Sequence, residues 1–126
     1  MDKRIFEQAV GYYSNVRVLD WRAYIGIALL GFAHGLNKPI FTWENYNAFA
    51  KFFMTLVFYL AFSFSINNCF DTECDRQGAK LKKNPVASGL ISFRGGISQS
   101  LAIASIGLVL TYFWFDPRAF LLYDLM

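Results

Sequence analysis

The sequence predicts an all-α protein, a multi-pass bundle of transmembrane helices. Two observations lead to this prediction. Hydrophobic residues make up 56% of the chain and aromatic residues 19%, whereas charged residues reach only 17%, below the roughly 25% of an average soluble protein. The apolar residues are also clustered, and runs of about 18 or more of them are typical of membrane spans.

The first predicted element is a short helix at the membrane interface, over residues 2–10. Four apolar side chains share one face of such a helix: Ile5, Phe6, Ala9 and Val10. We expect Gly11 and the polar residues after it to interrupt this helix. The chain then enters its first long apolar segment.

The predicted spans cover approximately residues 21–43, 49–70 and 95–115, and a fourth begins at 117–126. The second and third spans have apolar centres that hold no acidic residue, and Lys51 is the one basic residue in them. The first is less regular, because its apolar run contains His34. We interpret this histidine as a polar side chain that bonds a neighbouring helix or lies near the interface, although ionisable residues inside a membrane are often functional.

The basic residues predict an orientation, because cytoplasmic loops carry an excess of Lys and Arg. Nine of them lie before the first span or between the second and third, whereas three lie on the other side. We therefore expect a cell-membrane protein whose N-terminus and 67–94 loop face the cytoplasm. The resulting net charge of +3 suits anionic lipid headgroups or a diphosphate, and we expect no nucleic-acid partner.

The two cysteines do not indicate a zinc site. Cys69 and Cys74 lie five positions apart, without the CxxC spacing, and the single histidine is in another segment. We expect both to be free, reduced thiols in a helix.

A polar cluster follows the second span, in the string from Asn67 to Asp75. If the span continues as a helix, the spacing of four places Asn67, Asp71 and Asp75 on one face. Two carboxylates one turn apart repel each other unless a cation lies between them. Carboxylate and carboxamide oxygens suit Mg²⁺, which often binds one or two carboxylates together with substrate phosphates. These three residues are therefore the predicted magnesium ligands.

A basic block follows immediately and predicts contacts to a diphosphate. Its residues are Arg76, Lys80, Lys82 and Lys83. The alternative is that the acidic and basic residues form a solvated cytoplasmic loop, as is common where a chain leaves a membrane helix. In that case the chain is a small, non-enzymatic helical membrane protein that interacts with partners.

The string resembles a motif of the UbiA superfamily of intramembrane prenyltransferases. These proteins carry Asn-Asp-x-x-Asp-x-x-x-Asp at the end of their second transmembrane helix, and Asn67, Asn68, Asp71 and Asp75 fill those positions. A basic loop ending in Pro-x-x-Ser-Gly follows in the family, and here it closes at 85–89. The segment 17–21 is similar to the family's entry to its first helix. Two positions depart from the pattern: Asn68 stands for the more common Asp, and Asn84 stands where many members have Arg.

The resemblance implies Mg²⁺-dependent transfer of a prenyl group from a prenyl diphosphate to an acceptor of unknown identity within the membrane. Asp71 and Asp75 would be the catalytic residues and, with Asn67, the magnesium ligands. The implied diphosphate contacts are Asn67, Asn68, Arg76, Lys80, Lys82 and Lys83.

Family members have about nine helices and a second Asp-rich motif, so the resemblance covers only their N-terminal part. We expect about three to four helices of a UbiA-type fold here, a half-complete diphosphate site and no activity of the chain alone. A separate chain could carry the C-terminal half. The sequence leaves open whether this is a fragment, a broken reading frame or half of a split enzyme.

Overall fold

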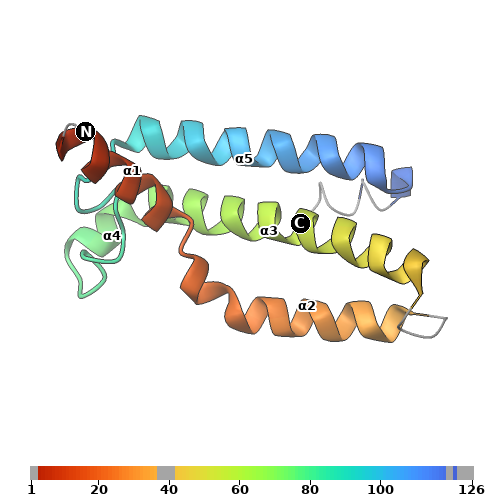
Figure 1. Cartoon of the computed structure of the whole chain (residues 1–126). Helices are drawn as coiled ribbons and strands as arrows, with labels where there is room; N and C mark the ends of the chain where they lie inside the picture. Colours follow the sequence, from red (N-terminus) through yellow and green to blue (C-terminus); the bar gives the residue numbers. More distant parts are fainter. Residues whose placement is uncertain (1–2, 37–41, 119–120, 122–126) are drawn as a thin grey trace.

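The computed structural model describes residues 3–36, 42–118 and 121 of the chain (Figure 1). The described part is helical and contains no strand. Its elements are α1 (Lys3–Asn15), η1 (Val18–Trp21, a 3₁₀ helix), α2 (Arg22–Gly35), α3 (Trp43–Phe70), α4 (Thr72–Arg76) and α5 (Phe93–Trp114). The predicted all-α class is thus confirmed for these residues.

Two helices are long and apolar enough to cross a membrane, α3 with 28 residues and α5 with 22. At 1.5 Å per residue they are about 42 Å and 33 Å long, more than the ~30 Å thickness of a hydrocarbon core. They correspond to the predicted spans at 49–70 and 95–115. Each begins earlier than predicted, because hydroxyl side chains cap the ends. The Thr42 side chain accepts from Asn45 N at 3.2 Å, and Ser92 Oγ accepts from Gly95 N at 3.0 Å.

The other two predicted spans are only partly visible. The 14 residues of α2 make a helix of about 21 Å, and residues 37–41, which complete the predicted span at 21–43, lie outside the described residues. Most of the predicted fourth span at 117–126 also lies outside them.

The expectation that Gly11 interrupts the N-terminal helix was wrong. Helix α1 runs through this residue and ends at Asn15. A Cβ atom at Gly11 would lie 2.7 Å from Ile91 Cγ2 and 2.9 Å from Leu90 Cγ. The glycine therefore allows a close approach of the 77–92 loop to α1, rather than breaking the helix.

Helices α3 and α5 lie side by side and antiparallel, and α2 runs along the other side of α3 (Figure 1). Small residues bring α3 and α5 together: Ser100 Oγ donates to Ser65 Oγ at 2.9 Å, and both serines are buried. Small side chains at membrane helix contacts let the backbones approach closely. Aromatic contacts join α2 to α3, with the Phe32 and Phe52 ring centroids 4.9 Å apart.

Buried Trp21 fixes the turn between α1 and α2. It packs in a cluster with Leu60 and Ala61 of α3, and its Nε1 donates to Val16 O at 2.8 Å. This contact holds the start of α2 against α3, and α1 lies at the same end of the α3–α5 pair as the 77–92 loop (Figure 1).

Candidate functional site

The Asn/Asp motif lies at the junction of α3 and α4. Asp71, with φ −81° and ψ 2°, separates the two helices. The backbone nevertheless keeps helical spacing, because Asp71 N donates to Asn67 O at 2.8 Å and Asp75 N donates to Asp71 O at 2.9 Å. Asn67, Asp71 and Asp75 therefore follow one another at intervals of one turn.

The three residues differ in environment. Asn67 and Asp71 are exposed, whereas Asp75 is 9% exposed and belongs to the buried residues. Glu73, which falls between the two aspartates, is exposed. The motif thus offers one open carboxylate at Asp71 and one largely covered carboxylate at Asp75.

Asn84 covers Asp75. Its Nδ2 donates to Asp75 Oδ2 at 3.0 Å and to Asn68 O at 2.8 Å. Its Oδ1 accepts from Val86 N at 3.0 Å and from Ala87 N at 3.1 Å, the turn that Asn side chains favour. One buried amide thereby joins the carboxylate, the end of α3 and the start of the Pro85–Gly89 segment.

A second group of amides ties the same region to α1 and α5. Asn68 Nδ2 donates to the backbone oxygen of Asn15 at 3.0 Å and to its Oδ1 at 3.1 Å. Asn15 Nδ2 donates to Gln99 Oε1 at 2.9 Å, and Gln99 Nε2 donates to Tyr12 O at 2.8 Å. Asn68 is 1% exposed, so a diphosphate contact by its amide would require these bonds to be exchanged.

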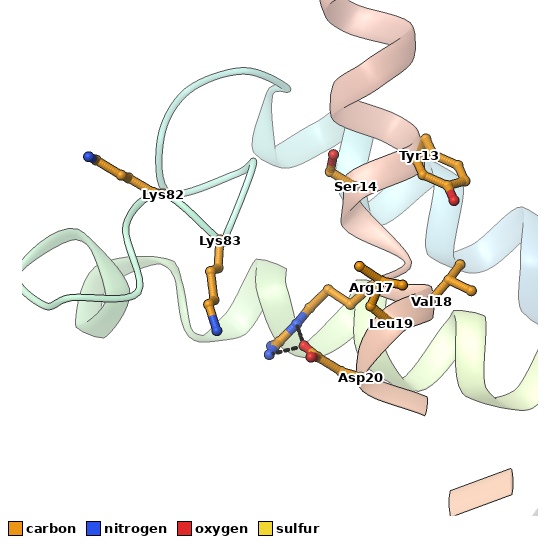
Figure 2. Close-up of a pocket in the computed structure, with 8 residues that line it drawn as sticks. All are labelled: Tyr13, Ser14, Arg17, Val18, Leu19, Asp20, Lys82 and Lys83. Atoms are coloured by element: carbon orange, nitrogen blue, oxygen red, sulfur yellow. Dashed lines mark hydrogen bonds and ion pairs between the residues drawn. The ribbon is translucent and has the colours of Figure 1, made fainter. Parts of the chain in front are cut away.

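The residues of the basic block lie in two separate locations. Arg76 Nε donates to Ala87 O at 3.4 Å, which holds the arginine along the Pro85–Gly89 segment. Lys80 is exposed in the loop. Lys82 and Lys83 line a cavity of about 390 Å³ beside the end of α1, together with Arg17 and Asp20 (Figure 2).

Asn67 borders a different cavity, of about 420 Å³, formed by α3 and the start of α2. Most of its wall is aromatic or aliphatic. The wall residues are Tyr24, Tyr59, Leu60, Phe62, Ser63, Phe64, Ile66 and Asn67. A polar motif residue therefore stands at the edge of a cavity whose lining is rich in aromatic residues but includes polar surface.

The described residues contain no group of three or more His, Cys, Asp or Glu side chains that could hold a metal ion. They do provide Asp71 and Asp75 one turn apart, with Asn67 one turn before them. Mg²⁺ often takes only one or two carboxylates and completes its shell with phosphates and water. Of the two carboxylates here, Asp71 is open, whereas Asp75 would bind an ion only if Asn84 left one of its oxygens accessible. The expectation for the cysteines is confirmed: both are free, with Cys69 buried and Cys74 exposed.

Three amides that hold this region together were not predicted as functional: Asn15, Asn84 and Gln99. Asn84 was seen only as a departure from the family pattern. Two signals in the sequence point to Asn84 and Gln99. Asn84 directly precedes a proline, where Asn typically forms side-chain turns, and Gln99 is a polar residue in an otherwise apolar span, where such residues usually bond a neighbouring helix.

Searches of protein-family models, curated proteins and solved structures returned no match to this chain.

Proposed function

We propose that this chain is a membrane protein that supplies the first Asp-rich motif of a UbiA-type prenyltransferase. The single observation that carries the proposal is the Asn67–Asp75 motif at the end of a membrane-length apolar helix, followed by a basic loop that closes at 85–89. The reaction is Mg²⁺-dependent transfer of a prenyl group from a prenyl diphosphate to an acceptor in the membrane.

Each group has a distinct task in this proposal. Asp71 and Asp75, with Asn67, would hold Mg²⁺, which would supply positive charge to stabilise the leaving diphosphate. Of the basic block, Arg76 and Lys80 stabilise the leaving diphosphate, whereas Lys82 and Lys83 line a separate cavity beside α1. Asn84 keeps the Asp75 carboxylate in place. The aromatic and aliphatic side chains of the cavity beside Asn67 contact the prenyl tail.

Because the described residues offer two carboxylates and no further acidic cluster near them, the site needs ligands from elsewhere. We propose that a second Asp-rich motif supplies them, carried either by a further part of the same protein or by a separate chain. The 126-residue chain alone should show no transfer in membranes, whatever acceptor is supplied. Turnover by the purified chain without a partner would contradict this proposal, unless two copies combined their motifs.

The direct test compares the two aspartates of the motif with Glu73, which lies between them in the sequence. Asp71→Ala should weaken Mg²⁺-dependent binding of geranyl diphosphate to the detergent-solubilised chain at least tenfold, because it removes a ligand and a charge. With the missing half supplied, Asp71→Ala and Asp75→Ala should each slow transfer by about 3–4 kcal/mol in activation free energy. Glu73→Ala is the matched control and should change little, because residue 73 does not share the one-turn spacing.

A second function is supported by the exposure of the loop. Asp71, Glu73 and Lys80 are all exposed, as expected of a solvated loop on a non-enzymatic membrane protein. The same binding experiment separates the two proposals. Geranyl diphosphate binding that is independent of Mg²⁺, or that falls equally in Asp71→Ala and Glu73→Ala, would favour the non-enzymatic protein.

A further inference from the structure

The cavity beside the end of α1 carries an excess of positive charge. Arg17 and Asp20 form an ion pair in its wall, with Arg17 Nη2 2.6 Å from Asp20 Oδ2. Lys82 and Lys83 also line it, and among the described residues neither lysine side chain has a hydrogen-bond or ion-pair partner. In Figure 2, Lys83 extends toward the Arg17–Asp20 pair, whereas Lys82 points away from it. Two positive charges therefore remain uncompensated.

Helix α1 presents an apolar stripe to its surroundings. Its exposed side chains are Ile5, Phe6, Ala9, Val10 and Tyr13. On the opposite face, Gly11 and Asn15 are buried against the 77–92 loop and α3. Because the two faces are about 180° apart at 100° per residue, the stripe points away from the rest of the described chain. An amphipathic helix with basic residues such as Lys3 at its start is typical of a membrane interface.

The stripe and the cavity are continuous, because Tyr13 belongs to both. Both lie at the end of the α3–α5 pair where these helices connect through α4 and the 77–92 loop (Figure 1). If α3 and α5 cross the bilayer, this end lies at the level of the lipid headgroups, since α3 is about 42 Å long and the hydrocarbon core about 30 Å thick.

From this arrangement we propose that α1 and the adjoining cavity form a binding site for an anionic phospholipid. The acyl chains lie along the stripe of α1, and the lipid phosphate enters the cavity and is held by Lys83, with Arg17 beside it. The inference rests on the membrane insertion proposed above but not on prenyl transfer. Of the described residues that line the cavity, none belongs to the Asn67–Asp75 motif.

The test uses the whole chain in dodecyl maltoside micelles, with bound lipid counted by native mass spectrometry. Phosphatidylglycerol should be retained in preference to phosphatidylcholine, whose choline neutralises its phosphate. Lys83→Gln should lower the affinity for phosphatidylglycerol about fivefold, the factor that one lysine contributes near an anionic lipid surface. Asp20→Asn should raise this affinity, because Arg17 would no longer be neutralised. A gain confined to phosphatidylglycerol, with retention of phosphatidylcholine unchanged, would not result from a damaged fold.

Lys80→Gln is the matched control, since Lys80 lies in the same loop, is exposed and does not line the cavity. Lys80→Gln should change the affinity for phosphatidylglycerol by less than twofold, compared with the fivefold loss expected for Lys83→Gln. If Lys83→Gln and Lys80→Gln lowered the affinity for phosphatidylglycerol equally, the proposal would be overturned, and binding would reflect a general attraction between the basic loop and anionic lipid. So would an absence of preference for phosphatidylglycerol, or a weaker affinity in Asp20→Asn.

Two further measurements identify the ligand and separate this site from the proposed enzyme site. Millimolar inorganic phosphate should not displace phosphatidylglycerol, because it lacks the acyl chains that contact α1; displacement would mean that the cavity binds soluble phosphate and would overturn the lipid assignment. Asp71→Ala should leave lipid retention unchanged while it removes Mg²⁺-dependent binding of geranyl diphosphate. Loss of both together would contradict a separate lipid site.

Discussion

At the scale of single residues, Asn84 links the motif to the loop that follows it. It is 1% exposed, and its amide makes four hydrogen bonds, two as donor and two as acceptor. Many members of the family that the sequence resembles have Arg at this position. In this chain a neutral amide takes the place next to Asp75, and Lys82 and Lys83 line a different cavity, beside α1.

Asn84→Ala should destabilise the loop end of the molecule. The substitution leaves the Val86 and Ala87 N–H groups and the Asp75 carboxylate without these partners, at a cost of about 3 kcal/mol in the free energy of local opening. Cys69 reports this opening, because it is buried beneath Gly96 and Val86. In a Cys74→Ser background, its labelling by a maleimide should become on the order of 100-fold faster, provided that reclosing is faster than labelling.

The control for this measurement is Gln77→Ala, at an exposed position of the same loop. It should leave the labelling of Cys69 close to that of the parent chain. Unchanged labelling in Asn84→Ala would show that the loop is held by its apolar contacts at Val86 and Ile91, and that the amide contributes little.

At the scale of helices, the sequence predicted the long elements better than their ends. Long apolar runs require helices in a membrane, because every backbone polar group must be bonded internally, and α3 and α5 follow those runs. Their first residues were missed because caps such as Thr42 and Ser92 act outside the apolar run. Gly11 was misjudged because its role depends on Leu90 and Ile91, about 80 positions away in the chain.

In the candidate site, too, only local features could be predicted from the sequence. The one-turn intervals between Asn67, Asp71 and Asp75 were predictable, because helical spacing is a local property. The burial of Asp75 was not predictable in this way, because it depends on Asn84 folding back over the helix end. The sequence of a polar loop does not show whether its residues are solvated or buried, because burial depends on tertiary contacts.

The contact of α5 with α3 depends on a glycine. A Cβ atom at Gly96 would lie 2.7 Å from Cys69 Sγ and 3.1 Å from Val86 Cγ2. Gly96→Ala should therefore destabilise the protein by about 1–3 kcal/mol, the usual cost of overpacking, as measured by circular dichroism melting in detergent. Adding Cys69→Ala should restore part of the loss, because the two side chains compete for one space.

Gly31→Ala is the matched substitution in α2. No described atom lies within 4 Å of a Cβ atom at this position, so the change should be neutral or stabilise the helix by up to about 1 kcal/mol. If Gly31→Ala destabilised the protein as much as Gly96→Ala, α2 would pack closely against something beyond the described residues.

At the scale of the whole molecule, the polar and apolar parts are separated along the helix axes. The motif, the basic loop and α1 gather at one end of the α3–α5 pair, and Thr42 and Glu44 lie at the other end (Figure 1). The sides of α3 and α5 are mostly open, because only 22% of the most apolar window of each helix is buried. Such open apolar sides suit contact with lipid or with further helices.

This separation makes the orientation testable. Nine Lys and Arg residues lie before the predicted first span or between the second and third, against three on the other side, so the positive-inside rule predicts that Gly78 is cytoplasmic and Asn45 is on the opposite side. Exposed Cys74 is a native reporter for the loop, since an impermeant maleimide should label it in inside-out vesicles and not in intact cells. In a Cys74→Ser background, Asn45→Cys should give the reverse pattern. Labelling of Asn45→Cys from the cytoplasmic side alone would invert the topology, and labelling of both positions from one side would mean that α3 does not cross the membrane.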